Sequence, residues 1–168
     1  MSKAGWTERL VEAIEASVAA VAAAHQGESI SGYALLTDDE LSTLSHLACT
    51  EEYLLRHSGP PETRWIAVNW PYSEGHERFR ATGEELRQWH LQVEEASDDE
   101  FNDHVRGSFE GITRALEQAR ARGILPSGAL VLACSTDPGP SLRRLAVGAA
   151  RALNSSDNFE NWKSGMGY

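Results

Sequence analysis

The sequence predicts an α+β fold, with a mainly antiparallel sheet of about four or more strands covered by helices. Helical and strand patterns follow one another irregularly, in the order helix, strands, helix, strand, helices, strand, helix. The length of 168 residues suits one domain and is too short for two ordinary ones, so we expect a single domain over residues 1–168. Hydrophobic residues make up 41% of the chain and charged residues 24%, which is typical of a globular protein.

The first predicted elements are a helix and a β-hairpin. The helix begins after Thr7, which we interpret as its N-cap, and Gly27 provides its C-terminal stop. A strand follows over residues 30–36, and the polar turn 37–40 leads into a return strand over residues 41–48. We expect these two strands to pair in antiparallel fashion.

A short helix and a third strand are predicted next. Residues 50–57 suit a helix, because Thr50 can act as its N-cap and two glutamates follow. The run S-G-P-P at 58–61 breaks that helix and is expected to form an exposed loop. Residues 64–70 alternate in the manner of a strand, which Pro71 ends.

Two capping boxes predict the helices in the middle of the chain. Thr82 and Glu85 have the required spacing, and their helix is expected to run to about residue 95. Ser97 and Glu100 have the same spacing, and apolar residues keep the helical period behind them as far as Gly123.

The C-terminal part of the chain predicts one more strand and one more helix. Residues 129–134 form a continuous apolar run between turn residues, which indicates a strand buried on both faces. Residues 141–153 have helical periodicity. The polar residues 154–168 are expected to form a partly irregular tail.

The net charge of the chain indicates which classes of binding partner are unfavourable. With 25 acidic and 15 basic residues, the formal net charge at pH 7 is -10. Such a charge disfavours binding to nucleic acid phosphates and to anionic membranes. The longest uncharged run is too short to span a bilayer, and the alanine-rich N-terminal segment lacks the pattern of a secretion signal. We therefore expect a cytoplasmic protein.

His46 and Cys49 are the residues that most resemble metal ligands or a nucleophile. Side chains three apart on a strand point to opposite faces, so these two would not converge on a zinc ion. Glu51 and Glu52 lie beside Cys49, and their negative charge opposes formation of a thiolate. We expect no metal, no cofactor and no catalytic residue.

Thr50, Glu51 and Glu52 have two interpretations. The carboxylates could act as acid and base, or hold a cation. They could equally be the first turn of a helix capped by Thr50, where the helix dipole favours negative charge by about 0.3–1 kcal/mol each.

The aromatic residues of the third predicted strand also have two interpretations. Trp70, beside Asn69, could line a ligand groove or a protein interface. In a strand, Trp65 and Trp70 would point to opposite faces, so at most one of them would line any single surface. The other interpretation places one in the core and one under a helix.

The densest charge of the chain lies in an acidic window without lysine or arginine. Its residues are Glu94, Glu95, Asp98, Asp99, Glu100 and Asp103. Residues 98–100 fall in the first turn of a predicted helix, where they contribute to capping. The remainder is expected to form a solvated acidic surface, which could bind a basic partner.

Arginines are concentrated around the last strand and helix. They are Arg120, Arg122, Arg143, Arg144 and Arg151. They could bind an anion, or they could pair with the acidic helix surface.

Four segments together resemble the domain-of-unknown-function 4303 family of bacterial proteins. They are I-S-G-Y-A-L-L-T-D at 30–38, A-C-T-E-E at 48–52, R-W-I-A-V-N-W-P-Y at 64–72 and R-A-L-N at 151–154. The similarity covers nearly the whole chain, and T-E-E and the spacing of the two tryptophans are its most specific motifs. Other members often have Asn before T-E-E, where this chain has Cys49, which further weakens a catalytic role for the thiol. The resemblance implies a small stand-alone bacterial α+β protein, and families of this build often include immunity proteins that bind and block a toxin.

Two functions follow as hypotheses. The first is a non-enzymatic, immunity-like interaction protein that binds a basic partner with the acidic residues Asp98, Asp99, Glu100 and Asp103. The alternative is a small-ligand-binding protein or enzyme with a pocket near Thr50, Glu51, Glu52, Asn69 and Trp70. A concave pocket that joins these five residues would favour the alternative.

Overall fold

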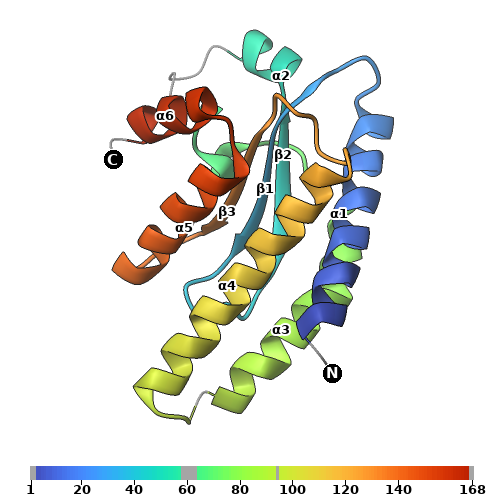
Figure 1. Ribbon diagram of the computed structural model, residues 1–168. Coiled ribbons are helices and arrows are strands. Elements are labelled where there is room, and N and C mark those ends of the chain that lie inside the picture. Colours follow the sequence, from blue (N-terminus) through green and yellow to red (C-terminus); the bar gives the residue numbers. More distant parts are fainter. Residues whose placement is uncertain (1–2, 58–63, 94, 167–168) are drawn as a thin grey trace.

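The computed structural model describes residues 3–57, 64–93 and 95–166. These residues form a small sheet between layers of helices (Figure 1). The elements are α1 (Lys3–Ala24), β1 (Ile30–Thr37), β2 (Ser45–Thr50), α2 (Glu51–Arg56), the 3₁₀ helices η2 (Ala67–Asn69) and η3 (His76–Phe79), α3 (Arg80–Val93), α4 (Asp98–Ala121), β3 (Leu130–Ser135), α5 (Pro140–Leu153) and α6 (Ser156–Gly165). The loop predicted at 58–61 lies outside the described residues.

The sheet has three strands in the order β2-β1-β3, with β1 in the centre (Figure 1). β1 pairs with β2 in antiparallel fashion, with Tyr33 opposite Ala48. It pairs with β3 in parallel, with Tyr33 opposite Val131. Residues 32–37 of β1 are all buried, because helices or loops cover both faces of the sheet. β3 is also buried on both faces, as its apolar run predicts.

The fold is α+β, but the predicted sheet of four or more mainly antiparallel strands is wrong. Residues 64–70 do not form a strand, since they contain the 3₁₀ helix η2. The ring of Trp70 instead packs against β1 at Gly32, where a Cβ would be only 2.7 Å from the ring. One antiparallel bridge, between Ala48 and Tyr72, is what remains of the predicted pairing.

The return strand is shorter than predicted. It begins at Ser45, because residues 38–44 form a wider turn. The Asp38 carboxylate accepts hydrogen bonds from the backbone N–H of Ser42 (2.6 Å) and from its hydroxyl (2.7 Å). Leu41 adopts a φ of 57° and is fully buried, so the turn contributes to the core.

Helices α1 and α4 cover the first face of the sheet, which carries Tyr33 and Leu35 of β1. The hydroxyls of Ser17 on α1 and Tyr33 share a buried hydrogen bond of 2.7 Å. Helix α3 packs outside this layer, and the indole N–H of Trp6 donates to the backbone carbonyl of Thr82 at 2.9 Å. We call this side of the sheet the first face below.

Two of the predicted N-caps are wrong, and two are confirmed. Thr7 and Thr82 lie inside α1 and α3, which already include Lys3 and Arg80. Both threonines are buried, and the Thr82 hydroxyl donates to the Phe79 carbonyl at 3.1 Å rather than capping a helix. The capping box of Ser97 with Glu100 and the N-cap at Thr50 are present as predicted.

Residues 64–70 and helix α6 cover the second face of the sheet, which carries Ala34 and Leu36 of β1. Helix α5 runs along β3 and contributes to both cores (Figure 1). Trp65 and Trp70 pack on this same face, contrary to the expectation for a strand, because a 3₁₀ turn does not alternate its side chains.

The C-terminal segment is helical where we expected a partly irregular tail. The Ser155 hydroxyl accepts from the backbone N–H of Asn158 and caps α6. Phe159 and Trp162 are buried against the second face, and their burial stabilises a helix too short to persist alone.

Candidate functional site

Thr50 lies in a polar network that fastens the start of α2 to the start of β1. Its hydroxyl accepts from the backbone N–H of Tyr53 (3.2 Å) and donates to the Glu28 carboxylate (2.5 Å). Arg56 donates to Oε1 of Glu28 at 2.6 Å, and the Tyr72 hydroxyl donates at 3.2 Å to Oε2, the oxygen that Thr50 also contacts. Hydrogen bonds from Thr50 and Arg56 lower the pKa of Glu28. Thr50 therefore acts as a structural link between these segments.

Glu51 and Glu52 contact different segments. Glu51 accepts from the guanidinium of Arg64 at 2.6 Å, which holds the start of the segment 64–70 against α2. Glu52 accepts from the backbone N–H of Ser29 at 2.8 Å, which holds the residue before β1. The two carboxylates thus diverge from one another, as capping residues of a first turn do.

Asn69 and Trp70 also separate. Asn69 is exposed, whereas Trp70 is buried and its indole N–H donates to the Arg64 carbonyl at 3.3 Å. Glu51 and Trp70 line one small cavity of about 100 Å³, together with Cys49 and Arg64. The other three residues of the alternative hypothesis, Thr50, Glu52 and Asn69, are not part of its lining. The structure therefore brings together two of the five.

The chemistry of this small cavity is limited. Burial raises the pKa of the Cys49 thiol to about 11, so the thiol is protonated at neutral pH. Glu51 is already paired with Arg64. With its thiol neutral and its carboxylate paired, the cavity offers no activated nucleophile among these residues.

His46 lies on the opposite side of the sheet from Cys49. Its ring stacks on Tyr33 and packs against Phe79, within the core of the first face. Burial lowers the pKa of His46 to about 4. Across the part of the chain that the structure describes, no group of three or more potential ligands is arranged to hold a metal ion.

The acidic residues predicted as a partner surface begin helix α4. Asp98, Asp99, Glu100 and Asp103 are all exposed, whereas Glu94 lies outside the described residues. Glu100 serves the capping box, and hydrogen bonds from Ser97 lower the pKa of its carboxyl. Asp103 accepts from Arg106 at 2.6 Å. We call the residues Asp98, Asp99, Glu100 and Asp103 the acidic end.

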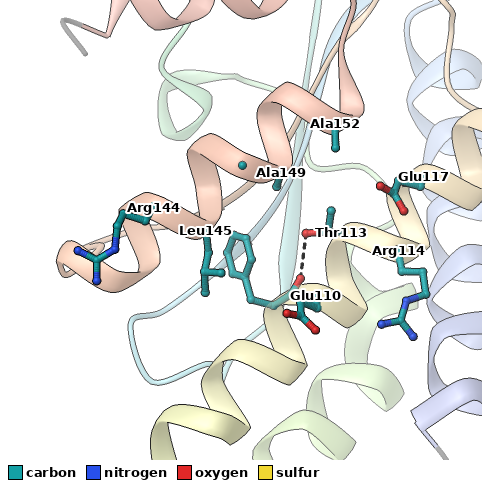
Figure 2. A pocket seen from close by; sticks show the side chains of 10 residues that line it. Glu110, Thr113, Arg114, Glu117, Arg144, Leu145, Ala149 and Ala152 are labelled. Carbon is teal, nitrogen blue, oxygen red and sulfur yellow. Dashed lines mark hydrogen bonds between the residues drawn. The ribbon is translucent and has the colours of Figure 1, made fainter.

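A groove between α4 and α5 continues from the acidic end. It consists of two hollows of about 360 and 400 Å³, which share Arg144 and Leu145 in their linings. Figure 2 shows Glu110 and Glu117 on the α4 side of the groove, with Ala149 and Ala152 on the α5 side. We call this feature the α4–α5 groove.

The comparison with protein-family models decides the family of this chain. A family model, Domain of unknown function (DUF4303), matches residues 10–155 of the 168. The chain belongs to the DUF4303 family. The comparisons with curated proteins and with solved structures give no match.

Sequence reasoning missed the groove of this DUF4303 protein, although one signal was present. One side of α5 carries small residues, namely Gly148, Ala149 and Ala152. A Cβ on Gly148 would meet nothing within 4 Å, so this part of α5 faces open space. Small residues on an exposed helix are compatible with a hollow, but they do not predict one alone.

Arg120, one of the predicted anion-binding arginines, has a structural role in this DUF4303 protein. Its guanidinium donates to the backbone carbonyls of Ser127 (2.7 Å), Ala129 (2.9 Å) and Leu153. Burial lowers its pKa. It therefore fixes the turn before β3 to the end of α5. Within the described ranges, no helix has the length and apolar character needed to cross a bilayer.

Proposed function

We propose that this DUF4303 protein is an interaction domain that binds a basic protein partner through α4 and the α4–α5 groove. The observation that carries the proposal is that the exposed carboxylates of α4, from the acidic end to Glu117, lie beside a groove with an apolar floor, whose lining also includes Arg106, Arg114 and Arg144. In its specific form, the proposal is that the basic partner is a toxin and that this protein has an immunity-like role.

The charge on α4 favours a basic partner. The helix carries six carboxylates and three arginines, and Arg120 is turned toward backbone carbonyls of the same chain. Among the remaining charges, the exposed Asp99, Glu110 and Glu117 have no ion-pair partner within the described residues. Exposed charges of one sign accelerate association with a partner of the opposite sign more than they increase affinity.

The groove supplies the apolar area that affinity requires. Phe109 and Ala149 are buried beneath it, and Leu145 is half-buried in its wall. The groove follows α4 from Asn102 to Glu117, a length of about 22 Å at 1.5 Å per residue. This length matches about four turns of a partner helix, whose basic residues would meet the exposed carboxylates of α4.

Charge reversal on α4 tests this proposal. The triple variant Asp99→Lys, Glu110→Lys and Glu117→Lys changes three exposed side chains outside the capping box, of which Asp99 lies in the first turn of α4. The control triple, Glu12→Lys, Glu15→Lys and Glu160→Lys, makes the same change of charge on exposed positions of α1 and α6. Each form is used to capture proteins from a lysate of the source organism, followed by mass spectrometry.

The proposal requires a basic protein that the wild type and the control triple capture and that the α4 triple does not. Its association rate with the wild type should fall steeply as salt rises, since exposed charges are screened. Loss of the partner in both triples, or retention in both, would show that α4 is not the binding surface. Equal urea unfolding midpoints exclude misfolding as the cause of any loss.

A further inference from the structure

A second cavity lies on the second face of the sheet, away from the α4–α5 groove. It occupies about 220 Å³ between the segment 65–68, strand β3 and helices α5 and α6. Trp65, Leu132 and Trp162 contribute apolar walls. The Trp65 ring lies so close to Gly165 of α6 that no Cβ fits between them, which sets the position of this wall.

Exposed apolar side chains gather at this cavity. Of the large hydrophobic residues that are exposed in the described chain, two line it: Val68, which is 51% exposed, and Met166, which is 36% exposed. The other two, Leu55 and Leu91, line none of the cavities named above. Exposed apolar surface that borders a concave site is a common mark of a binding site.

The charge of the cavity is opposite to that of the whole protein. Its lining residues include Arg143 and neither aspartate nor glutamate, although the chain has a formal net charge of -10. Across the described residues, no carboxylate lies within 4 Å of the Arg143 side-chain nitrogens. Thr136 and Pro138 line the cavity just before α5 begins at Pro140, so the positive end of that helix dipole lies nearby.

We infer that this cavity binds a small organic monocarboxylate with an apolar body. The carboxylate would pair with the exposed guanidinium of Arg143, and the body would pack against Trp65 and Trp162. An apolar protein cavity of about 150 Å³ accepts benzene, so 220 Å³ accommodates one aromatic ring or a medium aliphatic chain with a short arm. This binding is independent of the proposed interaction surface.

The chain contains a convenient reporter for this site. It has two methionines, Met1 and Met166, so a sample labelled with ¹³C at the methionine methyl groups gives a simple NMR spectrum. A Met166→Leu variant assigns the signal at the cavity. The probes are 3-phenylpropionate and octanoate, and their matched neutral controls are 3-phenylpropionamide and octanamide.

We expect saturable shifts of the Met166 signal, with a dissociation constant on the order of 0.1–1 mM for a ligand of this size. Arg143→Gln should weaken binding about tenfold through the loss of a charge-assisted hydrogen bond. Val68→Asp should weaken it as well, by placing a negative charge at the rim. Arg87→Gln, at an exposed arginine of α3, should leave the affinity unchanged.

The inference fails if neither carboxylate gives a saturable shift up to about 10 mM, a generous limit for fragment-sized ligands. It also fails if the amides bind as tightly as the acids, or if Arg87→Gln weakens binding as much as Arg143→Gln. Both Arg143 and Val68 are exposed, so the two variants should keep the wild-type urea midpoint and report on binding rather than folding. Relative affinities of the two acids then distinguish an aromatic from an aliphatic ligand.

Discussion

The two faces of the sheet are covered in different ways. On the first face, the long helices α1 and α4 bring successive turns of apolar side chains, and Leu10, Ile14 and Leu116 are completely buried. On the second face, the cover consists of a 3₁₀ turn and the short helix α6, and cavities of about 100 and 220 Å³ lie there. The larger α4–α5 groove is lined by residues of the two helices alone, whereas both cavities of the second face are also lined by residues of the sheet. The first face therefore carries most of the stability, and the second face offers space for a ligand.

Truncation of one tryptophan on each face gives the largest expected effect. Trp6→Ala removes a fully buried ring whose N–H bonds to the Thr82 carbonyl, so we expect a loss of about 4 kcal/mol in the free energy of unfolding. Trp65→Ala, at a half-buried ring of the second face, should reduce it by about 1–2 kcal/mol. Urea denaturation of both variants measures the difference. Equal losses would contradict the assignment of stability to the first face.

The buried histidine of the first face predicts a dependence of stability on pH. Burial lowers the pKa of His46 from the ordinary histidine value of 6.5 to about 4 in the folded state, so the unfolded chain takes up the proton first as pH falls. Its contribution is complete above pH 6.5 and is lost between 6.5 and 4, at up to 1.36 kcal/mol per pH unit and about 3 kcal/mol in total.

Urea denaturation at a series of pH values measures this effect. His46→Gln lacks the titrating ring, so its free energy of unfolding should change less over the same interval. Carboxylates with lowered pKa values also titrate near the acidic end of this pH interval. The quantity to follow is therefore the difference in the free energy of unfolding between the wild type and His46→Gln. Parallel curves for the two proteins would refute the role of His46.

The contact between Gly32 and Trp70 should give an intermediate effect. Gly32→Ala places a Cβ 2.7 Å from the indole ring and should destabilise the protein by about 2 kcal/mol through overpacking. Trp70→Phe makes room for that methyl group, so the double variant should be more stable than the sum of the two single losses predicts. Strict additivity in the double-mutant cycle would show that the Trp70 ring does not limit the size of the side chain at position 32.

The ion pair at the edge of the second face should give the smallest effect. Glu51 and Arg64 are both about 40% exposed, and such pairs contribute little because water screens them. Glu51→Gln should change the free energy of unfolding by less than about 0.5 kcal/mol. A loss above about 2 kcal/mol would mean that this pair, rather than apolar packing, holds the segment 64–70 in place.

Local signals in the sequence predicted the helices well. The capping box of Ser97 with Glu100 and the N-cap at Thr50 depend on residues within one turn, and both are present. Thr7 and Thr82 misled the prediction because burial against other elements determined their environment, and no short pattern reveals that. The same limit applies to Glu28, which bonds to Thr50 across 22 positions and gave no local signal.

The sheet was harder to predict, because the pairing of its strands depends on residues that lie far apart in the sequence. The alternation of residues 64–70 is compatible with a strand, yet packing of Trp70 on Gly32 selects a 3₁₀ turn instead. The apolar run of β3 predicts burial on both faces but not the direction of its neighbour. The acidic end was visible from composition, whereas the α4–α5 groove and the cavity beside Arg143 depend on how helices meet the sheet.

The parallel pairing of Gly32 with Leu130 has a consequence for biosynthesis. β1 and β2 leave the ribosome early and can form their hairpin, but the other edge of β1 keeps unpaired N–H and C=O groups until β3 has been translated. During that interval an apolar strand with an open edge is a site where nascent chains can associate wrongly. Translation of β3, rather than formation of the helices before it, therefore closes this edge of the central strand.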